Sequence, residues 1–389
     1  MGFFRLLLPL SKRNKRDLSE LARYLEKDDL KKVKRMLKQK KIGFAYRSLN
    51  ISQKLISDTS FPFLNAAIED SEISKTTDNI NSVVEQQVRA KKYKEFSEVA
   101  YEKIKGFIAP NIVGMDFAKE AAMLQLFAVE KVHLLLLGDP GTGKTEILRS
   151  VNELAPISSF GLGSGISGVG LTVSVQGKEI HKGLLPIADD GVCCIDELNL
   201  MKQKDRGALL NAMEKGFITY NKGNKSLSLD ARVSVLATAN PTGDRFVGKI
   251  IDTFKKQIPF DSALLTRFHI IFFIRRPNEK EFANITQKIV SGKEMRVEIN
   301  DSLFIRDYIE FSHLITVKFD EKLKTTIVDF VARLKKDEDK FLVEINPRTI
   351  IGIMRFAKAA ARLELRNKVE EKDLKKVFDI LEKSLYIKR

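Results

Sequence analysis

The pattern of apolar and polar positions divides the chain into a helical beginning, a mixed middle and a helical end. From Asp17 onward, apolar residues recur at helical spacing through much of the first fifty positions, which predicts amphipathic helices. Residues 68–82 are polar and show no periodicity, as expected of a linker or a loosely held loop. Beyond about residue 300 the spacing is helical again. We therefore expect helical regions on both sides of a central segment.

The central segment, from 132 to about 275, alternates short apolar runs with helical stretches. Such alternation is typical of a parallel sheet with crossover helices. The expected strands are 132–137, 157–160, 192–195, 232–238 and 269–273. Two other stretches, 171–183 and 217–229, alternate on either side of a turn and predict β-hairpins inserted into this core. The predicted fold class is α/β, with a five-stranded parallel sheet, inserted β-hairpins and three parts at 1–105, 106–275 and 276–389.

The composition is that of a soluble globular protein. Hydrophobic residues make up 43% of the chain and charged residues 30%, and no apolar run approaches the roughly 20 residues of a membrane span. The first ten residues are mostly apolar but are interrupted by Arg5, so we expect a packing segment rather than a signal peptide. These features predict a protein without a membrane partner, located in the cytoplasm or with the nucleoid.

The chain is strongly basic. Its net charge is +16, and residues 1–50 hold fifteen Lys or Arg against five Asp or Glu. Contact with nucleic acid would explain this excess, and so would a solvated helix face. The two cysteines, Cys193 and Cys194, are adjacent in an apolar run, and the four histidines are scattered. We therefore expect neither a disulfide framework nor a metal site built from protein groups alone.

A glycine-rich loop, GDPGTGKT at 138–145, follows the first expected strand and precedes a helical stretch. In this pattern glycines let backbone N–H groups surround phosphates, the lysine reaches the β and γ phosphates, and the final hydroxyl binds Mg²⁺. The N-terminus of the following helix also favours an anion. We therefore predict ATP and Mg²⁺ as ligands, held by Asp139, Pro140, Gly141, Thr142, Gly143, Lys144, Thr145 and Glu146.

A second glycine segment, GSGISG at 163–168, matches the dinucleotide-binding spacing G-x-G-x-x-G. That motif belongs directly after the first strand of a dinucleotide-binding fold, whereas this segment follows the second expected strand. We interpret the match as accidental. The glycines are then expected to form a flexible hinge that leads into the hairpin at 171–183.

An acidic pair ends the third expected strand, in VCCIDE. Asp196 is suited to hold Mg²⁺ and Glu197 to polarise the attacking water, because carboxylates at a strand end project into the crevice beside the phosphates. Asn240 follows the next strand and is suited to orient that water. Arg267 precedes the last strand, and the sequence alone leaves open whether it is an arginine finger or a surface arginine.

Lysines stand at or near the tips of both expected hairpins. Lys178 belongs to the first hairpin, and Lys222 and Lys225 belong to the second. Basic tips suit a nucleic-acid backbone, although exposed turns also carry lysine for solubility. These three lysines are the candidate DNA-binding residues.

Together these segments resemble the AAA+ ATPase module of the minichromosome maintenance (MCM) replicative helicases, from about residue 108 to the end of the chain. The similarity covers GDPGTGKT, GVGLT, GVCCIDE, DRGALLNAMEKG, ARVSVLATANP, ALLTRFHIIF and INPRTIIGIMRFAKAAAR. The resemblance implies a P-loop core with a helical lid and an ATP-driven ring, usually a hexamer, with nucleotide sites between subunits. It further implies hairpins that move along DNA in the central channel, and a nuclear location becomes possible.

The resemblance also assigns roles by position. Its nucleotide-handling positions are Lys144 and Thr145 in the phosphate loop, Asp196 and Glu197 as the Mg²⁺ and water-activating pair, Asn240 as the first sensor, Arg267 as the finger given in trans, and Arg348 as the second sensor. Lys222 falls at the family's DNA-contacting lysine. Backbone near adenine is implied for Ile112, Val113 and Gly114.

The sequence departs from the MCM pattern in several places. The first 105 residues show neither the family's oligonucleotide-binding barrel nor its zinc module, and no winged helix is expected after the lid. DELNLM stands where the family shows DEFDKM, and GKT stands where it commonly has AKS. His269 replaces an aspartate, and the hairpin around Lys178 is shorter.

The sequence therefore predicts an MCM-like ATPase that binds single-stranded or forked DNA and couples ATP hydrolysis to translocation or unwinding. It is expected to act as a homo-hexamer or as a subunit of a hexameric ring. Two alternatives stay open at this point: a protein-remodelling ATPase like the MoxR or magnesium-chelatase relatives, and a regulatory subunit of a helicase ring. DNA affinity at low salt and self-assembly with ATP would separate these readings.

Overall fold

The computed structural model describes residues 88–386 except 177–178, 223–224, 244, 249 and 291–298. Contacts between residues divide the chain into two units, 1–100 and 101–389. Within the first unit, residues 88–97 form a helix. The helices expected from Asp17 onward and the linker expected at 68–82 lie outside the described residues. The second unit contains the sheet.

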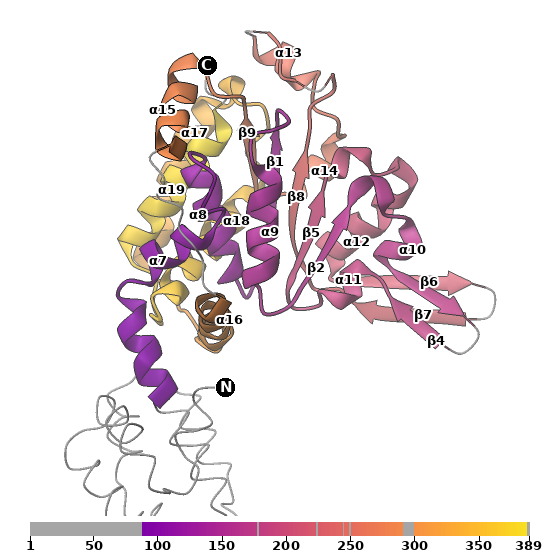
Figure 1. Cartoon of the computed structure of the whole chain (residues 1–389), viewed down its shortest axis with the longest axis horizontal. Coiled ribbons are helices and arrows are strands. Elements are labelled where there is room, and N and C mark those ends of the chain that lie inside the picture. The colour runs from indigo at the N-terminus through magenta and orange to yellow at the C-terminus, as the bar shows by residue number, and fades with distance from the viewer. Residues whose placement is uncertain are drawn as a thin grey trace, which may run out of the picture. The chain divides into compact units, whose positions relative to one another are not determined.

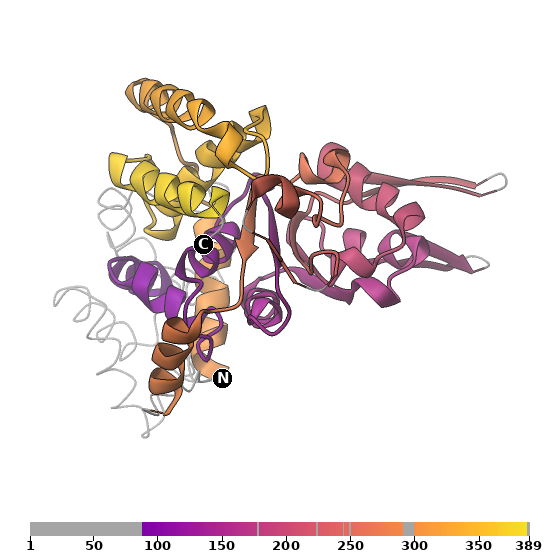
Figure 2. The ribbon, with the colours of Figure 1, turned by 90° about the horizontal axis from the view of Figure 1, so that it is seen from above.

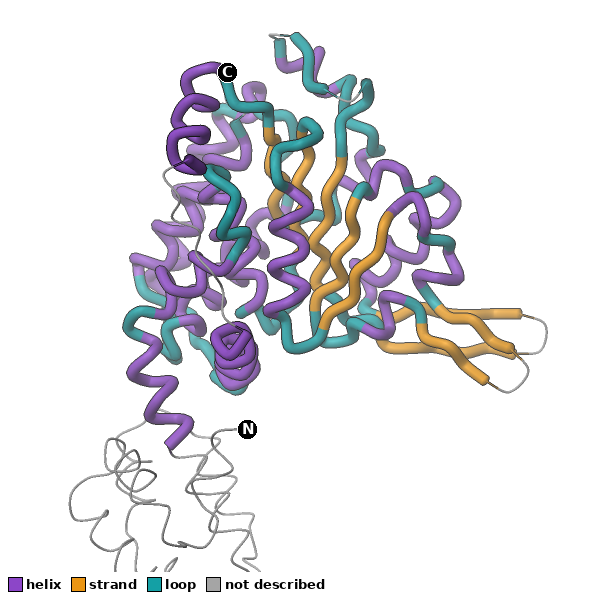
Figure 3. Tube along the Cα trace, in the orientation of Figure 1, coloured by secondary structure: helices purple, strands orange, loops and turns teal. Residues whose placement is uncertain are grey.

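A five-stranded parallel sheet forms the centre of the second unit (Figure 3). Its strands are β1 (His133–Gly138), β2 (Ser158–Leu162), β5 (Val192–Asp196), β8 (Ser234–Ala239) and β9 (Ile270–Ile274). Their order across the sheet is β2-β5-β8-β1-β9. All five strands predicted from the apolar runs are confirmed. Both faces of a parallel sheet are covered, so its strands are apolar nearly throughout and stand out in the sequence.

Helices cover both faces of the sheet. On one side α9 (Lys144–Leu154) packs on β5 and β8, and α8 (Asp116–Leu126) packs on α9 and β1. On the other side α12 (Arg206–Lys215) contributes to the core cluster that includes Cys193. The alternation of a strand turns Cys194 the opposite way, and its Sγ lies 3.7 Å from Leu148 O of α9. Both cysteines are buried and free, as expected of small hydrophobic residues.

Short helices connect the strands on the side of the hairpins and above the sheet. They are η2 (Gly163–Gly165), α10 (Gly168–Leu171), α11 (Leu184–Ile187), η3 (Leu198–Leu200), η4 (Gln203–Asp205), α13 (Ile251–Lys255) and α14 (Ser262–Leu265).

Two antiparallel hairpins are inserted between these elements. β3 (Val173–Gln176) pairs with β4 (Glu179–Lys182), and β6 (Phe217–Lys222) pairs with β7 (Lys225–Asp230). Both hairpins project in the same direction, beyond the edge of the sheet that β2 forms (Figures 1 and 2). Both predicted hairpins are confirmed, and their ends point to one side of the unit.

The C-terminal helices lie at the other edge of the sheet, beside β9 (Figure 1). They are α15 (Glu279–Val290), α16 (Ile299–His313), α17 (Glu321–Lys336), η5 (Glu338–Lys340), α18 (Pro347–Leu363) and α19 (Glu371–Leu385), and α7 (Ala100–Phe107) opens the unit. α18 packs against α8 and α19, and α19 packs against β9. The lid helices α16 to α19 are therefore attached to the sheet through α8 and β9. None of the described helices combines the length and the apolar character that a membrane crossing requires.

Candidate nucleotide-binding site

The phosphate loop between β1 and α9 is shaped by two glycines in left-handed backbone conformation. Gly141 has φ +75° and Gly143 has φ +89°, which residues with a side chain rarely adopt. A Cβ at Gly143 would lie 2.9 Å from Ile112 Cγ2, so the loop packs closely on the segment that contains Ile112. With the N-terminus of α9 behind it, the loop suits a polyphosphate.

Lys144 is buried at the start of α9 and is held by the loop itself. Its Nζ donates hydrogen bonds to Gly138 O at 2.8 Å and Asp139 O at 2.7 Å. Burial lowers the pKa of Lys144 to about 8, because removing an ammonium from water disfavours its charged form. A bound polyphosphate would supply this cation with a full negative charge in place of two neutral carbonyls.

Oxygen ligands suited to Mg²⁺ meet beside the loop. Thr145 Oγ1 of α9 donates to both carboxylate oxygens of Asp196, at 3.2 Å and 3.0 Å. Asp196 ends β5 and is buried. A hydroxyl and a carboxylate next to a phosphate loop are the hard oxygen donors that Mg²⁺ takes in sites completed by substrate phosphates. The residues present therefore fit this ion.

Glu197 and Asn240 lie at the same carboxyl edge of the sheet. Glu197 has φ 54° and ψ 46°, an uncommon left-handed conformation for a residue other than glycine. Its N–H donates to Thr238 Oγ1 at 2.9 Å. Asn240 follows β8 directly, and its N–H donates to Asn199 Oδ1 at 3.0 Å. The sheet order places β8 between the strands that carry Gly138 and Asp196, so Glu197 and Asn240 follow neighbouring strands on the side of the phosphate loop.

Asp139 holds the loop in place through its side chain, a role that the motif did not indicate. Its buried carboxylate accepts hydrogen bonds from Phe246 N at 2.8 Å and from Arg276 N at 3.0 Å. These two contacts tie the phosphate loop to the segment after β8 and to the end of β9. The part of Asp139 that faces the loop interior is its backbone carbonyl, which Lys144 and Thr142 contact.

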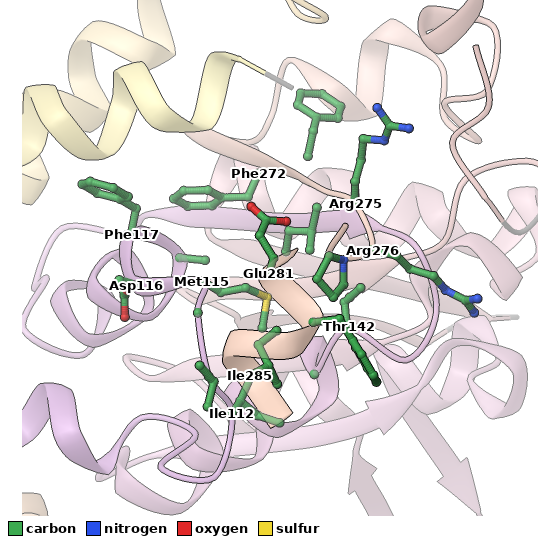
Figure 4. Close-up of a pocket in the computed structure, with 18 of the residues that line it drawn as sticks. Ile112, Met115, Asp116, Phe117, Thr142, Phe272, Arg275, Arg276, Glu281 and Ile285 are labelled. Atoms are coloured by element: carbon green, nitrogen blue, oxygen red, sulfur yellow. The ribbon is translucent and has the colours of Figure 1, made fainter. Parts of the chain in front are cut away.

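A cavity of about 1110 Å³ opens beside the phosphate loop (Figure 4). Its lining comes from residues 111–118, from Gly141–Gly143, from the end of β9, from α15, and from Lys383 and Tyr386 near the C-terminus. Side chains of α15 such as Glu281 and Ile285 lie around the same space as Ile112 and Met115 (Figure 4). The lining includes Ile112, Val113 and Gly114, and their expected position near adenine stays a prediction.

Arg267 and Arg348 lie at the amino ends of the strands, opposite the carboxyl ends that carry the phosphate loop. Arg267 precedes β9, and its Nη2 pairs with Glu214 Oε2 at 2.5 Å. Arg348 is at the start of α18, where its N–H donates to Asn346 Oδ1 at 2.9 Å. Burial, followed by the charge of Arg267, lowers the pKa of Arg348. The six residues of β1 separate the amino end of this strand from the phosphate loop. At strand spacing the two ends of β1 lie about 16 Å apart.

The sheet-containing region and the C-terminal helices each match the model of a known domain. The MCM P-loop domain matches residues 89–293, more than half of the chain, and the MCM AAA-lid domain matches residues 303–385. The chain belongs to the MCM family. The predicted α/β fold, with its P-loop core, inserted hairpins and helical lid, is confirmed.

Curated MCM relatives include DNA replication licensing factor mcm7 of Schizosaccharomyces pombe, 30% identical over 350 residues that cover 81% of this chain and 46% of that protein. Mcm7-A of Xenopus laevis is 32% identical over 310 residues, or 73% of this chain and 43% of the relative. Minichromosome maintenance protein MCM of Saccharolobus solfataricus is 29% identical over 328 residues, with coverages of 78% and 47%. The chain thus spans less than half the length of these relatives.

The lysines that the MCM resemblance places on DNA belong to the hairpins. Lys222 and Lys225 form the last backbone pair of the hairpin β6–β7. Lys178 lies outside the described residues. The expected contact of these lysines with DNA stays a prediction.

Two buried histidines, His133 and His269, connect β1 to its neighbours at the amino ends of the strands, near Arg267. Their scattered positions in the sequence did not predict this contact. Val235 N–H donates to His133 Nδ1 at 3.1 Å, and His133 N–H donates to His269 Nδ1 at 2.9 Å. Burial lowers the pKa of His133 to about 3 and that of His269 to about 2. Nη1 of Arg355 in α18 lies 3.3 Å from His269 Nε2. His269, which departs from the MCM pattern, therefore lies between the sheet and α18.

Proposed function

We propose that this MCM-family chain hydrolyses ATP in a ring of subunits and uses the hydrolysis to move along or unwind DNA. The observation that carries the proposal is the separation of two sets of residues. The phosphate loop, Asp196 and Glu197 stand at the carboxyl ends of the parallel strands, and Arg267 and Arg348 stand at the amino ends. One subunit cannot bring both sets to one nucleotide, whereas two neighbouring subunits can.

Within one subunit, the residues divide the work on ATP. Backbone N–H groups of the loop and Lys144 bind the β and γ phosphates, and the cavity beside Ile112 receives the base. Thr145 and Asp196 would hold Mg²⁺, which would neutralise charge that develops on the phosphates. Glu197 accepts a proton from the attacking water, and Asn240 orients that water. This assignment is supported by the distances among Lys144, Thr145 and Asp196.

Arg267 and Arg348 act on the nucleotide of the adjacent subunit. Contacts of this kind are heterologous, because one surface meets a different surface on the next copy, and they generate a closed ring when the rotation closes. An arginine supplied in trans contributes about 10³- to 10⁵-fold to turnover in other nucleotide hydrolases. In a single subunit Arg267 pairs with Glu214. In the ring Arg267 would leave Glu214 and contact the γ phosphate bound by the adjacent subunit.

DNA is the proposed track of the ring. The proposal is supported by the net charge of +16, by the two hairpins that project the same way, and by relatives named DNA replication licensing factors. Lys178, Lys222 and Lys225 would contact the phosphate backbone. A location with nuclear or nucleoid DNA follows from this proposed function. The division of the chain into three parts at residues 105 and 275 also stays a prediction.

The test is ATPase activity with and without single-stranded DNA, together with the mass of the assembly formed with an ATP analogue and forked DNA. We expect hydrolysis that DNA stimulates, a hexameric mass, and loss of turnover in Lys144→Ala and Glu197→Gln. Lys222→Ala with Lys225→Ala should weaken DNA binding and stimulation while basal hydrolysis remains. Turnover that survives Lys144→Ala would refute the site. Hydrolysis without DNA affinity at low salt would refute the DNA track and favour a protein-remodelling ATPase.

A further inference from the structure

One hydroxyl group inside the sheet connects the two acidic residues of the site. Thr238 lies on β8 and is buried, with 2% of its surface exposed. Its Oγ1 accepts the hydrogen bond from Glu197 N–H at 2.9 Å and donates to Asp196 Oδ1. The hydroxyl therefore acts as an acceptor for one residue of the acidic pair and as a donor to the other.

The same carboxylate also accepts from Thr145 Oγ1 at 3.0 Å. The connected groups thus run from the backbone of Glu197 through Thr238 and Asp196 to the first turn of α9. The geometry points to Thr238 as a positioning residue, which sets Asp196 and Glu197 relative to Thr145 without touching nucleotide itself. This inference rests on the proposed ATPase function and assigns to it a residue for which the sequence predicted no role.

Glu197 needs such support because of its backbone. Its left-handed conformation is sparsely populated for residues with a side chain and persists only where the surroundings hold it. Thr238 holds the N–H of Glu197 from one side. On the other side Gly163 packs against the carbonyl, since a Cβ at Gly163 would lie 2.2 Å from Glu197 O. The peptide that aims the Glu197 side chain is therefore clamped between two named contacts.

Threonine is chemically suited to this position. The hydroxyl must accept from an amide and donate to a carboxylate at once, which a serine or threonine hydroxyl can do. The branched Cβ also restricts χ1, so the direction of the hydroxyl is fixed on the strand. Valine has the same shape and neither capacity, whereas serine keeps both capacities and loses only a methyl group.

A simpler role must be separated from positioning, because any buried hydroxyl that pairs a backbone N–H contributes to stability. The same strand offers the matched control. Ser234, at the other end of β8, is also buried, and its Oγ accepts from Val132 N–H at 3.2 Å. It lies four residues from Thr238, about 13 Å along the strand, and away from the acidic pair.

The experiment compares Thr238→Val, Thr238→Ser and Ser234→Ala in the full chain. The first readout needs neither nucleotide nor metal: native-state hydrogen exchange at the amide of Glu197. Loss of the hydroxyl in Thr238→Val should raise this exchange rate about tenfold or more, because the amide loses its acceptor. Thr238→Ser and Ser234→Ala should leave the rate close to that of the wild type.

The second readout is steady-state hydrolysis. Thr238→Val should lower kcat about 10- to 100-fold, the effect of displacing reacting groups by roughly 1 Å. Its KM for ATP should stay close to the wild-type value, because Lys144 and the loop are untouched, and half-maximal activity should require more Mg²⁺. Thr238→Ser should restore most of kcat, and Ser234→Ala should lower the melting temperature without lowering kcat.

Three results would overturn the inference. They are wild-type kcat in Thr238→Val, a Thr238→Ser variant as slow as Thr238→Val, and a Ser234→Ala variant whose kcat falls as much as that of Thr238→Val. Failure of the proposed function is distinguishable. If the wild-type protein shows no ATPase activity that Lys144→Ala abolishes, both the proposed function and the positioning role fail. If Thr238→Val keeps full ATPase activity, only the positioning role fails.

Discussion

Acid should destabilise the fold through His133 and His269 before the carboxylates titrate. Each Nδ1 accepts a backbone hydrogen bond, so protonation there removes an acceptor and places a charge in the core. Both folded-state values, about 3 and about 2, lie below the value of about 6.5 for a histidine in an unfolded chain. The unfolded state therefore binds protons first, and stability is lost as the pH falls below about 6.5.

The size of the effect follows from these values. Each ring lowers the free energy of unfolding by about 1.4 kcal/mol for each pH unit below about 6.5. Between about pH 7.5 and pH 5.0 this amounts to about 2 kcal/mol for each ring and about 4 kcal/mol for the pair. A loss of that size corresponds to a fall in melting temperature of roughly 10 °C.

Thermal unfolding followed by circular dichroism at the two pH values measures this fall. The double variant His133→Asn with His269→Asn keeps an oxygen acceptor near each Nδ1 but cannot take up a proton. It should be less stable than the wild type at the higher pH and should lose much less on acidification. His181→Asn, which removes an exposed histidine of β4, is the matched control and should retain the wild-type fall. Equal falls in the wild type and the double variant would refute the reasoning.

Two further substitutions test contacts around the site. Gly163→Ala places a Cβ 2.2 Å from Glu197 O and should reduce kcat about tenfold or more. Gly165→Ala is the control, because its Cβ meets no atom within 4 Å, and it should have wild-type kcat. Equal kcat in the two variants would contradict a role for the contact between Gly163 and Glu197. Asp139→Asn leaves one acceptor for the N–H groups of Phe246 and Arg276, so chemical denaturation should show a loss of about 1–3 kcal/mol. Unchanged stability would mean that these hydrogen bonds contribute little.

Much of the fold was predictable from local patterns. The runs that contain Leu134–Leu137 and Val192–Ile195 are buried on both faces, and such strands appear in a sequence as continuous apolar stretches. The phosphate loop was predictable because Gly141, Gly143 and Lys144 lie within four consecutive positions of the chain. Their chemistry depends on spacing within a few residues, which a sequence displays directly.

Contacts between distant segments were not predictable in this way. His133 and His269 are 136 positions apart, and no local periodicity marks their pairing. Thr238 offered one signal, a polar residue inside an apolar strand, but nothing in the sequence named its partners.

Gly163 shows how one residue type can serve two purposes. The sequence suggested a flexible hinge at 163–168. In the structure Gly163 is buried in η2 and packs on the backbone of Glu197, a close approach that only a residue without a side chain permits. Spacing alone could not distinguish freedom of the backbone from the need for proximity. Hinge motion of this segment stays a prediction.

The shared nucleotide site is the central claim, and mixing two inactive variants tests it most directly. Lys144→Ala lacks the phosphate-binding lysine, and Arg267→Ala lacks the arginine at the opposite ends of the strands. In rings assembled from equal amounts of both, about one quarter of the interfaces pair an intact loop with an intact arginine from the neighbour. The mixture should therefore regain about one quarter of wild-type ATPase activity. A mixture as inactive as its two components would contradict a nucleotide site shared between subunits.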